Sequence, residues 1–160
     1  MLSSPRVWFS ARTRQLRCED ASVQYFLIDP EVAGGLGDNS VVEPGQKVTR
    51  LHYEFEGWLG DCLCQSWPCY ILSEAAFELA TRSGLTGFGR EPVEISKSEQ
   101  FEMFYPDRVV PPFVWLTVTG KAGQADFGLT ERSKLVVSEA ALELLRSCGV
   151  EHADIEVYPG

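Results

Sequence analysis

The feature that most constrains this chain is an internal repeat. Residues 73–85 read SEAAFELATRSGL and residues 138–150 read SEAALELLRSCGV, a constant offset of 65 positions with seven of the thirteen residues identical. An apolar run precedes each copy, and a short run rich in β-forming residues, EPVEIS or ADIEVY, follows it. Each copy therefore predicts strand, helix, strand. Because a solenoid needs three or more stacked units, we expect a duplicated element inside one domain.

Both copies carry the start and stop signals of a helix. Ser73 and Ser138 stand where a hydroxyl can accept a hydrogen bond from an unpaired amide of the first turn. Gly84 and Gly149 stand where the helices should end, since glycine enters the left-handed region at little cost. We therefore expect two topologically equivalent helices.

The rest of the chain reads mainly as strands. Alternating apolar and polar residues predict half-buried strands at 6–12, 22–28, 48–57 and 113–120. The Gly- and Pro-rich segment 30–47 predicts a loop, and KSEQFEMFYP (97–106) predicts a short helix that is capped by Ser98 and ends before Pro106. The expected fold is α/β or α+β: a single domain over 1–160 with a mixed sheet. Strands and a loop fill 1–56, and the duplicated strand-helix-strand region fills 57–160.

Composition and charge exclude several classes of function. The chain has 160 residues, of which 44% are hydrophobic and 23% charged, and its net charge is −9. Such an acidic surface repels phosphates, so neither nucleic acid nor an anionic membrane is an expected partner. Residues 1–17 carry four arginines and no acid, but the apolar core of a signal peptide does not follow. A cytoplasmic protein is the expectation.

The cysteines form the pattern that most resembles a metal site. Cys62, Cys64 and Cys69 lie within GDCLCQSWPC, whereas zinc sites usually pair ligands as C-x2–4-C with a second pair downstream. No such second pair follows. We therefore predict no metal and no cofactor, and we expect these three thiols to be reduced and mostly buried.

Two tryptophans beside acidic residues suggest a protein-binding site. Trp58 and Trp67 stand in turn-like sequence, where their indoles either project from the surface or cap the core, and Glu54, Glu56 and Asp61 lie close by. Aromatic anchors surrounded by acids are typical of a surface that binds a basic protein, with the acids steering association. The alternative is a small hydrolase or nucleotide- or sugar-modifying enzyme that uses the Glu54–Asp61 carboxylates for acid–base chemistry. Neither of the two histidines lies in a catalytic motif, and no dinucleotide fingerprint, P-loop or metalloprotease helix is present.

Several phrases resemble the bacterial immunity proteins of polymorphic and contact-dependent toxin systems. They are EGWLGD (56–61), SWPCYILSE (66–74), SGLTGF (83–88), VEISKSEQF (93–101), PFVWLTVTGKAG (112–123), DFGL (126–129) and LVVSEAALELL (135–145). The resemblance implies a small acidic α/β protein without catalytic residues, which neutralises a cognate, basic toxin by tight stoichiometric binding. The C-x-x-C-G motif of one myxobacterial immunity group is absent from the sequence, so the resemblance implies no metal.

Overall fold

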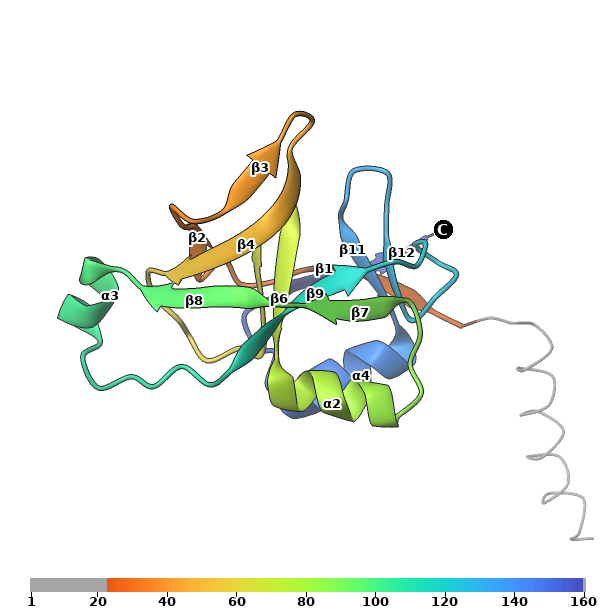
Figure 1. Cartoon of the computed structure of the whole chain (residues 1–160). Helices are drawn as coiled ribbons and strands as arrows, with labels where there is room; N and C mark the ends of the chain where they lie inside the picture. The colour runs from red at the N-terminus through yellow and green to blue at the C-terminus, as the bar shows by residue number, and fades with distance from the viewer. Residues whose placement is uncertain (1–22, 160) are drawn as a thin grey trace, which may run out of the picture.

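The two repeated segments follow the same strand-helix-strand path, as predicted. The closing strand of the first copy lies at 88–91, however, and most of the run EPVEIS (91–96), which was expected to form it, belongs to a strand of another sheet. The computed structural model describes residues 23–159, so the strand expected at 6–12 lies outside the described part (Figure 1). The elements of the first copy are β6 (Cys69–Ser73), α2 (Glu74–Arg82) and β7 (Phe88–Glu91), and those of the second are β11 (Leu135–Ser138), α4 (Glu139–Cys148) and β12 (Asp154–Tyr158). The repeat in the sequence is therefore also a repeat in the structure.

The predicted caps are confirmed in both copies. Ser73 Oγ accepts a hydrogen bond from the amide of Ala76 at 3.3 Å, and Ser138 Oγ accepts one from Ala141 at 3.2 Å. Gly149 caps α4 in the left-handed conformation, with φ of 108°. In the first copy the helix closes at Ser83, one residue earlier than expected, and left-handed Gly84 follows. The same local chemistry thus begins and ends both helices.

The two copies interlock through β9 (Phe113–Val118) and β1 (Tyr25–Asp29), which we call the central strands because each lies between the two strands of one copy. One antiparallel sheet has the order β5-β6-β9-β7 and the other β10-β11-β1-β12. The other additional strands are β5 (Leu63–Ser66) and β10 (Phe127–Leu129). Strand β1 precedes the first copy in the chain yet lies in the sheet of the second, whereas β9 precedes the second copy and lies in the sheet of the first.

The register of the two central strands is the same. Ser73 pairs with Phe113 in one sheet, and Ser138 pairs with Tyr25 in the other. On the other side of each central strand, Leu116 pairs with Arg90 as Ile28 pairs with Ile155. The duplication therefore extends to strands whose sequences show no repeat.

A third sheet forms around β4 (Lys47–Phe55), which overlaps the strand predicted at 48–57. It also contains β2 (Gly34–Leu36), β3 (Val41–Glu43) and β8 (Val93–Lys97). The expectation of a loop over 30–47 is therefore wrong in part, because β2 and β3 lie there and pair antiparallel with β4. Glycine permits this pairing: a Cβ on Gly34 would lie 1.9 Å from the carbonyl oxygen of Glu54.

The α+β class is confirmed, but the expected mixed sheet is divided into three. Within residues 23–159 there are three helices and three four-stranded sheets, and β4 with β8 is the parallel pair. Strands from 1–56 and 57–160 share sheets, because β1 pairs with β11 and β4 with β8. Helices α2 and α4 pack together, and α3 (Glu99–Phe104), capped by Ser98 as predicted, lies at the far end of β8 (Figure 1).

No helix in the described part of the chain is both long and apolar enough to cross a membrane.

The described core has two clusters of buried residues. One lies around α2 and α4 and includes Leu72 and Leu145, and the other includes Phe55 and Phe101. The segment that joins β4 to β5 contains Trp58 and Asp61, so it connects the third sheet to the duplicated ones.

Candidate functional site

Asp61 is a buried structural carboxylate, which corrects the expectation that it acts as an exposed steering charge. Its residue is 1% exposed. Oδ1 accepts a hydrogen bond from the amide of Glu151 at 3.1 Å, and Oδ2 accepts one from the amide of His152 at 2.8 Å. These amides follow α4, so Asp61 ties the first copy to the second. Buried charge is tolerated only with such partners.

The second copy has the equivalent carboxylate. Asp126 lies 65 positions after Asp61, and Thr86 lies 65 positions before Glu151. Asp126 Oδ2 accepts hydrogen bonds from the Thr86 amide at 2.9 Å and from its hydroxyl at 3.1 Å. Each copy thus uses an aspartate to hold the segment that follows the helix of the other. The fold itself accounts for an aspartate at both positions.

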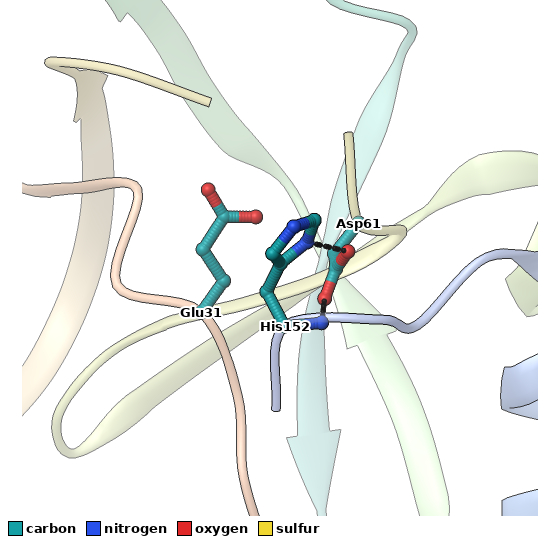
Figure 2. Close-up of side chains that lie close together, drawn as sticks. All are labelled: Glu31, Asp61 and His152. Carbon is teal, nitrogen blue, oxygen red and sulfur yellow. Dashed lines mark hydrogen bonds and ion pairs between the residues drawn. The ribbon is translucent and has the colours of Figure 1, made fainter. Parts of the chain in front are cut away.

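His152 forms a close pair with Asp61 that the sequence analysis did not predict. Its Nδ1 lies 2.8 Å from Asp61 Oδ1, and its side chain is 40% exposed. The hydrogen bond to Asp61 raises the pKa of the imidazole. Figure 2 shows the ring lying between the carboxylates of Asp61 and Glu31. A half-exposed imidazole is therefore held in place by a buried acid.

Glu31 completes the cluster and was also missed. Its backbone is fixed to β5, because its carbonyl accepts a hydrogen bond from Gln65 at 2.9 Å. Its residue is 8% exposed, and Oε2 accepts a hydrogen bond from the amide of Leu59 at 2.7 Å. Its other oxygen, Oε1, is buried, and no group within residues 23–159 donates a hydrogen bond to it. Burial raises the pKa of Glu31, and the amide of Leu59 opposes this effect.

One potential ligand atom from each of Glu31, Asp61 and His152 lies within 4.8 Å of the other two. The three residues come from the connections β1–β2, β4–β5 and α4–β12. Two carboxylates and an imidazole can bind a metal ion or transfer a proton. One difference between the two copies could have indicated this site: the second copy has His152 where the first has Gly87, so the repeat itself does not account for the histidine.

Trp58 belongs partly to the core, so it does not project as the anchor we expected. Its ring packs edge-on against Phe55 and Phe113, with centroid distances of 6.4 and 6.2 Å. Its indole nitrogen donates to the carbonyl of Asp61 at 2.9 Å, and its own carbonyl accepts a hydrogen bond from the guanidinium of Arg108. Trp58 thus stabilises the connection between β4 and β5.

A pocket of about 330 Å³ brings two of the expected binding residues together. Its lining includes Glu31, Val32, Glu56, Trp58, Leu59 and Tyr105. Glu56 is exposed, as expected of a steering acid, whereas Glu54 on β4 is half-buried and does not line this pocket. Val32 and Leu59 are 67% and 59% exposed. This part of the surface therefore combines an acid with unusually exposed apolar groups.

Trp67 lies elsewhere, in the turn between β5 and β6. It is 46% exposed, as an anchor should be, and its indole nitrogen donates to the carbonyl of Arg132 at 3.2 Å. That carbonyl belongs to the connection between β10 and β11. The structure thus places Trp67 on this connection and does not bring it to the pocket of Trp58 and Glu56.

The cysteine cluster does not converge on one point. Cys62, Cys64 and Cys69 are free and buried, and their expected burial is confirmed. Cys62 packs in the core cluster around α2 and α4, whereas the other two pack in the cluster of Phe55. Burial raises the pKa of Cys62 to about 12 and that of Cys69 to about 11. They are small core side chains with inert thiols.

Comparisons with known proteins do not extend these findings. No protein-family model matches the sequence, and no curated protein matches it. The resemblance to immunity proteins therefore stays an expectation.

Proposed function

We propose that this chain is a cytoplasmic immunity protein that neutralises a cognate bacterial toxin by direct stoichiometric binding. The supporting observation is a pocket lined by Val32, Glu56, Leu59 and Tyr105, next to which α3 exposes Met103 and Phe104, the two residues before Tyr105. We call these six residues the α3 surface. Figure 1 shows α3 far from the paired helices α2 and α4.

The apolar residues of the α3 surface contribute little to the core. Met103 is 72% exposed and Phe104 is 62% exposed, so two of the six residues of α3 are large apolar side chains that face solvent. Phe101 holds the helix in place, because it is fully buried against Phe55 at a centroid distance of 6.4 Å. Clustered large apolar side chains that water can reach are a mark of protein-interaction sites. The neighbouring pocket provides a recess for a partner side chain.

The charges around this surface favour a basic partner. Glu56, Glu99 and Glu102 are exposed there, and the whole chain carries −9. The guanidinium of Arg108 is occupied locally, since it lies 4.7 Å from the ring centroid of Tyr105 and bonds to Trp58. A toxin that acts on nucleic acids or nucleotides is commonly basic and would be attracted to such a field.

The test begins with affinity capture from the native organism and identification of the captured protein. That protein should be toxic when expressed alone, and co-expression of this chain should abolish its toxicity. A captured protein without toxicity, or toxicity that persists on co-expression, would refute the proposal.

The surface is tested with two matched variants. Phe104→Ala removes an exposed side chain of the α3 surface, and Val157→Ala removes one that is 60% exposed on β12. Truncation of an anchor typically costs about 2 kcal/mol, so Phe104→Ala should speed dissociation at least tenfold. Val157→Ala should leave the rate unchanged. Equal rates for both variants would show that the partner binds elsewhere.

A further inference from the structure

We propose that Glu31, Asp61 and His152 form a binding site for one divalent transition-metal cation. The inference stands independently of the proposed toxin binding. It rests on three observations: the comparison between the two copies of the fold, an unpaired buried oxygen, and the ligand chemistry of the three side chains.

The first observation is that the fold does not need two of these residues. Asp126 fulfils the role of Asp61 in the other copy, yet the position equivalent to His152 is Gly87. The equivalent of Glu31 is Thr119. Glu31 lies six residues after Tyr25, which pairs with the capping Ser138, and Thr119 lies six residues after Phe113, which pairs with the capping Ser73. The equivalent cluster around Asp126 thus contains neither a histidine nor a second acid. The fold therefore does not require Glu31 and His152, which occur only in the cluster around Asp61.

The second observation is the state of Glu31. The residue is only 8% exposed, and in the described part of the chain its buried Oε1 receives no hydrogen bond. An unpaired carboxylate oxygen in the interior is unfavourable, so proteins pair such oxygens with donors or metal ions. Oε2 is already occupied by the amide of Leu59. Figure 2 shows the Glu31 carboxylate beside the ring of His152, and one Glu31 oxygen lies within 4.8 Å of a ligand atom of both Asp61 and His152.

The third observation is the chemistry and spacing of the ligands. Two carboxylate oxygens and an imidazole nitrogen suit zinc, manganese, iron or cobalt, whereas an imidazole is unusual for calcium or magnesium. Two ligands on one zinc ion lie at most about 4.4 Å apart, given bond lengths of about 2.0–2.2 Å. The ligand atoms here lie within 4.8 Å of one another, so small side-chain movements would suffice.

Access and remaining coordination also fit. The side chain of His152 is 40% exposed, so an ion can enter from solvent and keep water ligands. The bound ion would link three connections that are distant in sequence, those after β1, before β5 and after α4. It would therefore stabilise the junction between the two copies.

The experiment titrates the full chain with Zn²⁺ by calorimetry after treatment with a chelator. Wild-type protein should bind one equivalent at this site. Glu31→Gln and His152→Ala should each weaken that binding at least tenfold, because ligand loss has effects of this size or larger. Glu56→Gln is the matched control, since it removes an exposed carboxylate from the neighbouring pocket and should bind as the wild type does. All four proteins contain the same cysteines, so any zinc held by thiols cancels in the comparison.

Thermal unfolding provides a second measurement and confirms that each variant is folded. Zn²⁺ should raise the melting temperature of the wild type and of Glu56→Gln more than that of the other two variants. The proposal is overturned if the wild type binds no zinc, or if the folded Glu31→Gln and His152→Ala variants bind as the wild type does. Equal affinity for Mg²⁺ and Zn²⁺ would overturn the assignment to a transition metal.

Discussion

The two aspartates that hold the copies together are expected to differ strongly in their contribution to stability. The perturbation is Asp61→Asn, with Asp126→Asn as its matched control. Asparagine keeps the shape of the side chain but replaces one acceptor oxygen with a donor and removes the charge. Each variant therefore tests the hydrogen bonds of one carboxylate without leaving a cavity.

The expected magnitude follows from the burial of each carboxylate. Asp61 is 1% exposed and accepts two backbone amides. Hydrogen bonds to a charged group contribute about 1.5–3 kcal/mol each, and asparagine can replace at most one of them, so the loss should be about 2–4 kcal/mol. The bonds between Asp126 and Thr86 are exposed, so water can replace them, and the oxygen of asparagine can still accept the part-buried hydrogen bond from the Ser138 hydroxyl; the loss should be about 1 kcal/mol.

Thermal and urea unfolding of the full chain measure both variants. A loss of about 3 kcal/mol corresponds to a decrease in melting temperature of roughly 6–12 °C for a chain of this size. The urea slopes should match that of the wild type, which would show that the unfolded states are comparable. If the two variants lose equal stability, the burial of Asp61 does not strengthen the contribution of its hydrogen bonds to the free energy of unfolding.

Three further predictions concern packing and reactivity. Trp58→Ala should lower the free energy of unfolding by about 3 kcal/mol because its ring packs in the core, whereas the more exposed Trp67→Ala should lower it by less than about 1 kcal/mol in urea unfolding. Gly34→Ala should destabilise the protein more than Gly35→Ala by urea unfolding, since a Cβ at Gly34 collides with a backbone oxygen and one at Gly35 meets open space. The thiol of Cys62, whose pKa is raised to about 12, should resist alkylation at pH 8 in the native protein and react once urea unfolds it; fast native labelling would contradict its burial.

Local signals in the sequence predicted the repeated elements correctly. Ser73, Ser138 and Gly149 act within one helical turn, so their roles follow from spacing alone. The interlocked central strands could not be predicted, because Tyr25 and Phe113 lie outside the repeated phrases. Their pairing is set by long-range contacts, which the local patterns of a single sequence do not reveal.

The candidate site shows the same division. Glu56 and Trp58 were expected to act together, and they do line one pocket because they are close in the chain. Glu31, Asp61 and His152 meet only because the two copies interlock, so the sequence indicated the cluster only through His152, which stands where the first copy has Gly87. Trp58 was expected to be exposed on the basis of its turn-like neighbours, but the nearby rings of Phe55 and Phe113 cover it.

The proposed metal site and the α3 surface share a structural element, and this leads to a final prediction. The carboxylate of Glu31 serves both sites: its Oε2 accepts a hydrogen bond from the amide of Leu59, and the same group is a ligand of the proposed cation. Leu59 is 59% exposed on the α3 surface. A bound ion would hold the Glu31 carboxylate in place, and with it the backbone of Leu59, so a partner would bind a more ordered surface. Linkage requires the reciprocal effect, in which the partner raises the affinity for the ion by the same factor. Partner affinity measured with zinc and with chelator should therefore differ for the wild type and be equal for His152→Ala, which leaves the α3 surface unchanged. If zinc changes both affinities equally, the ion acts at another place on the complex.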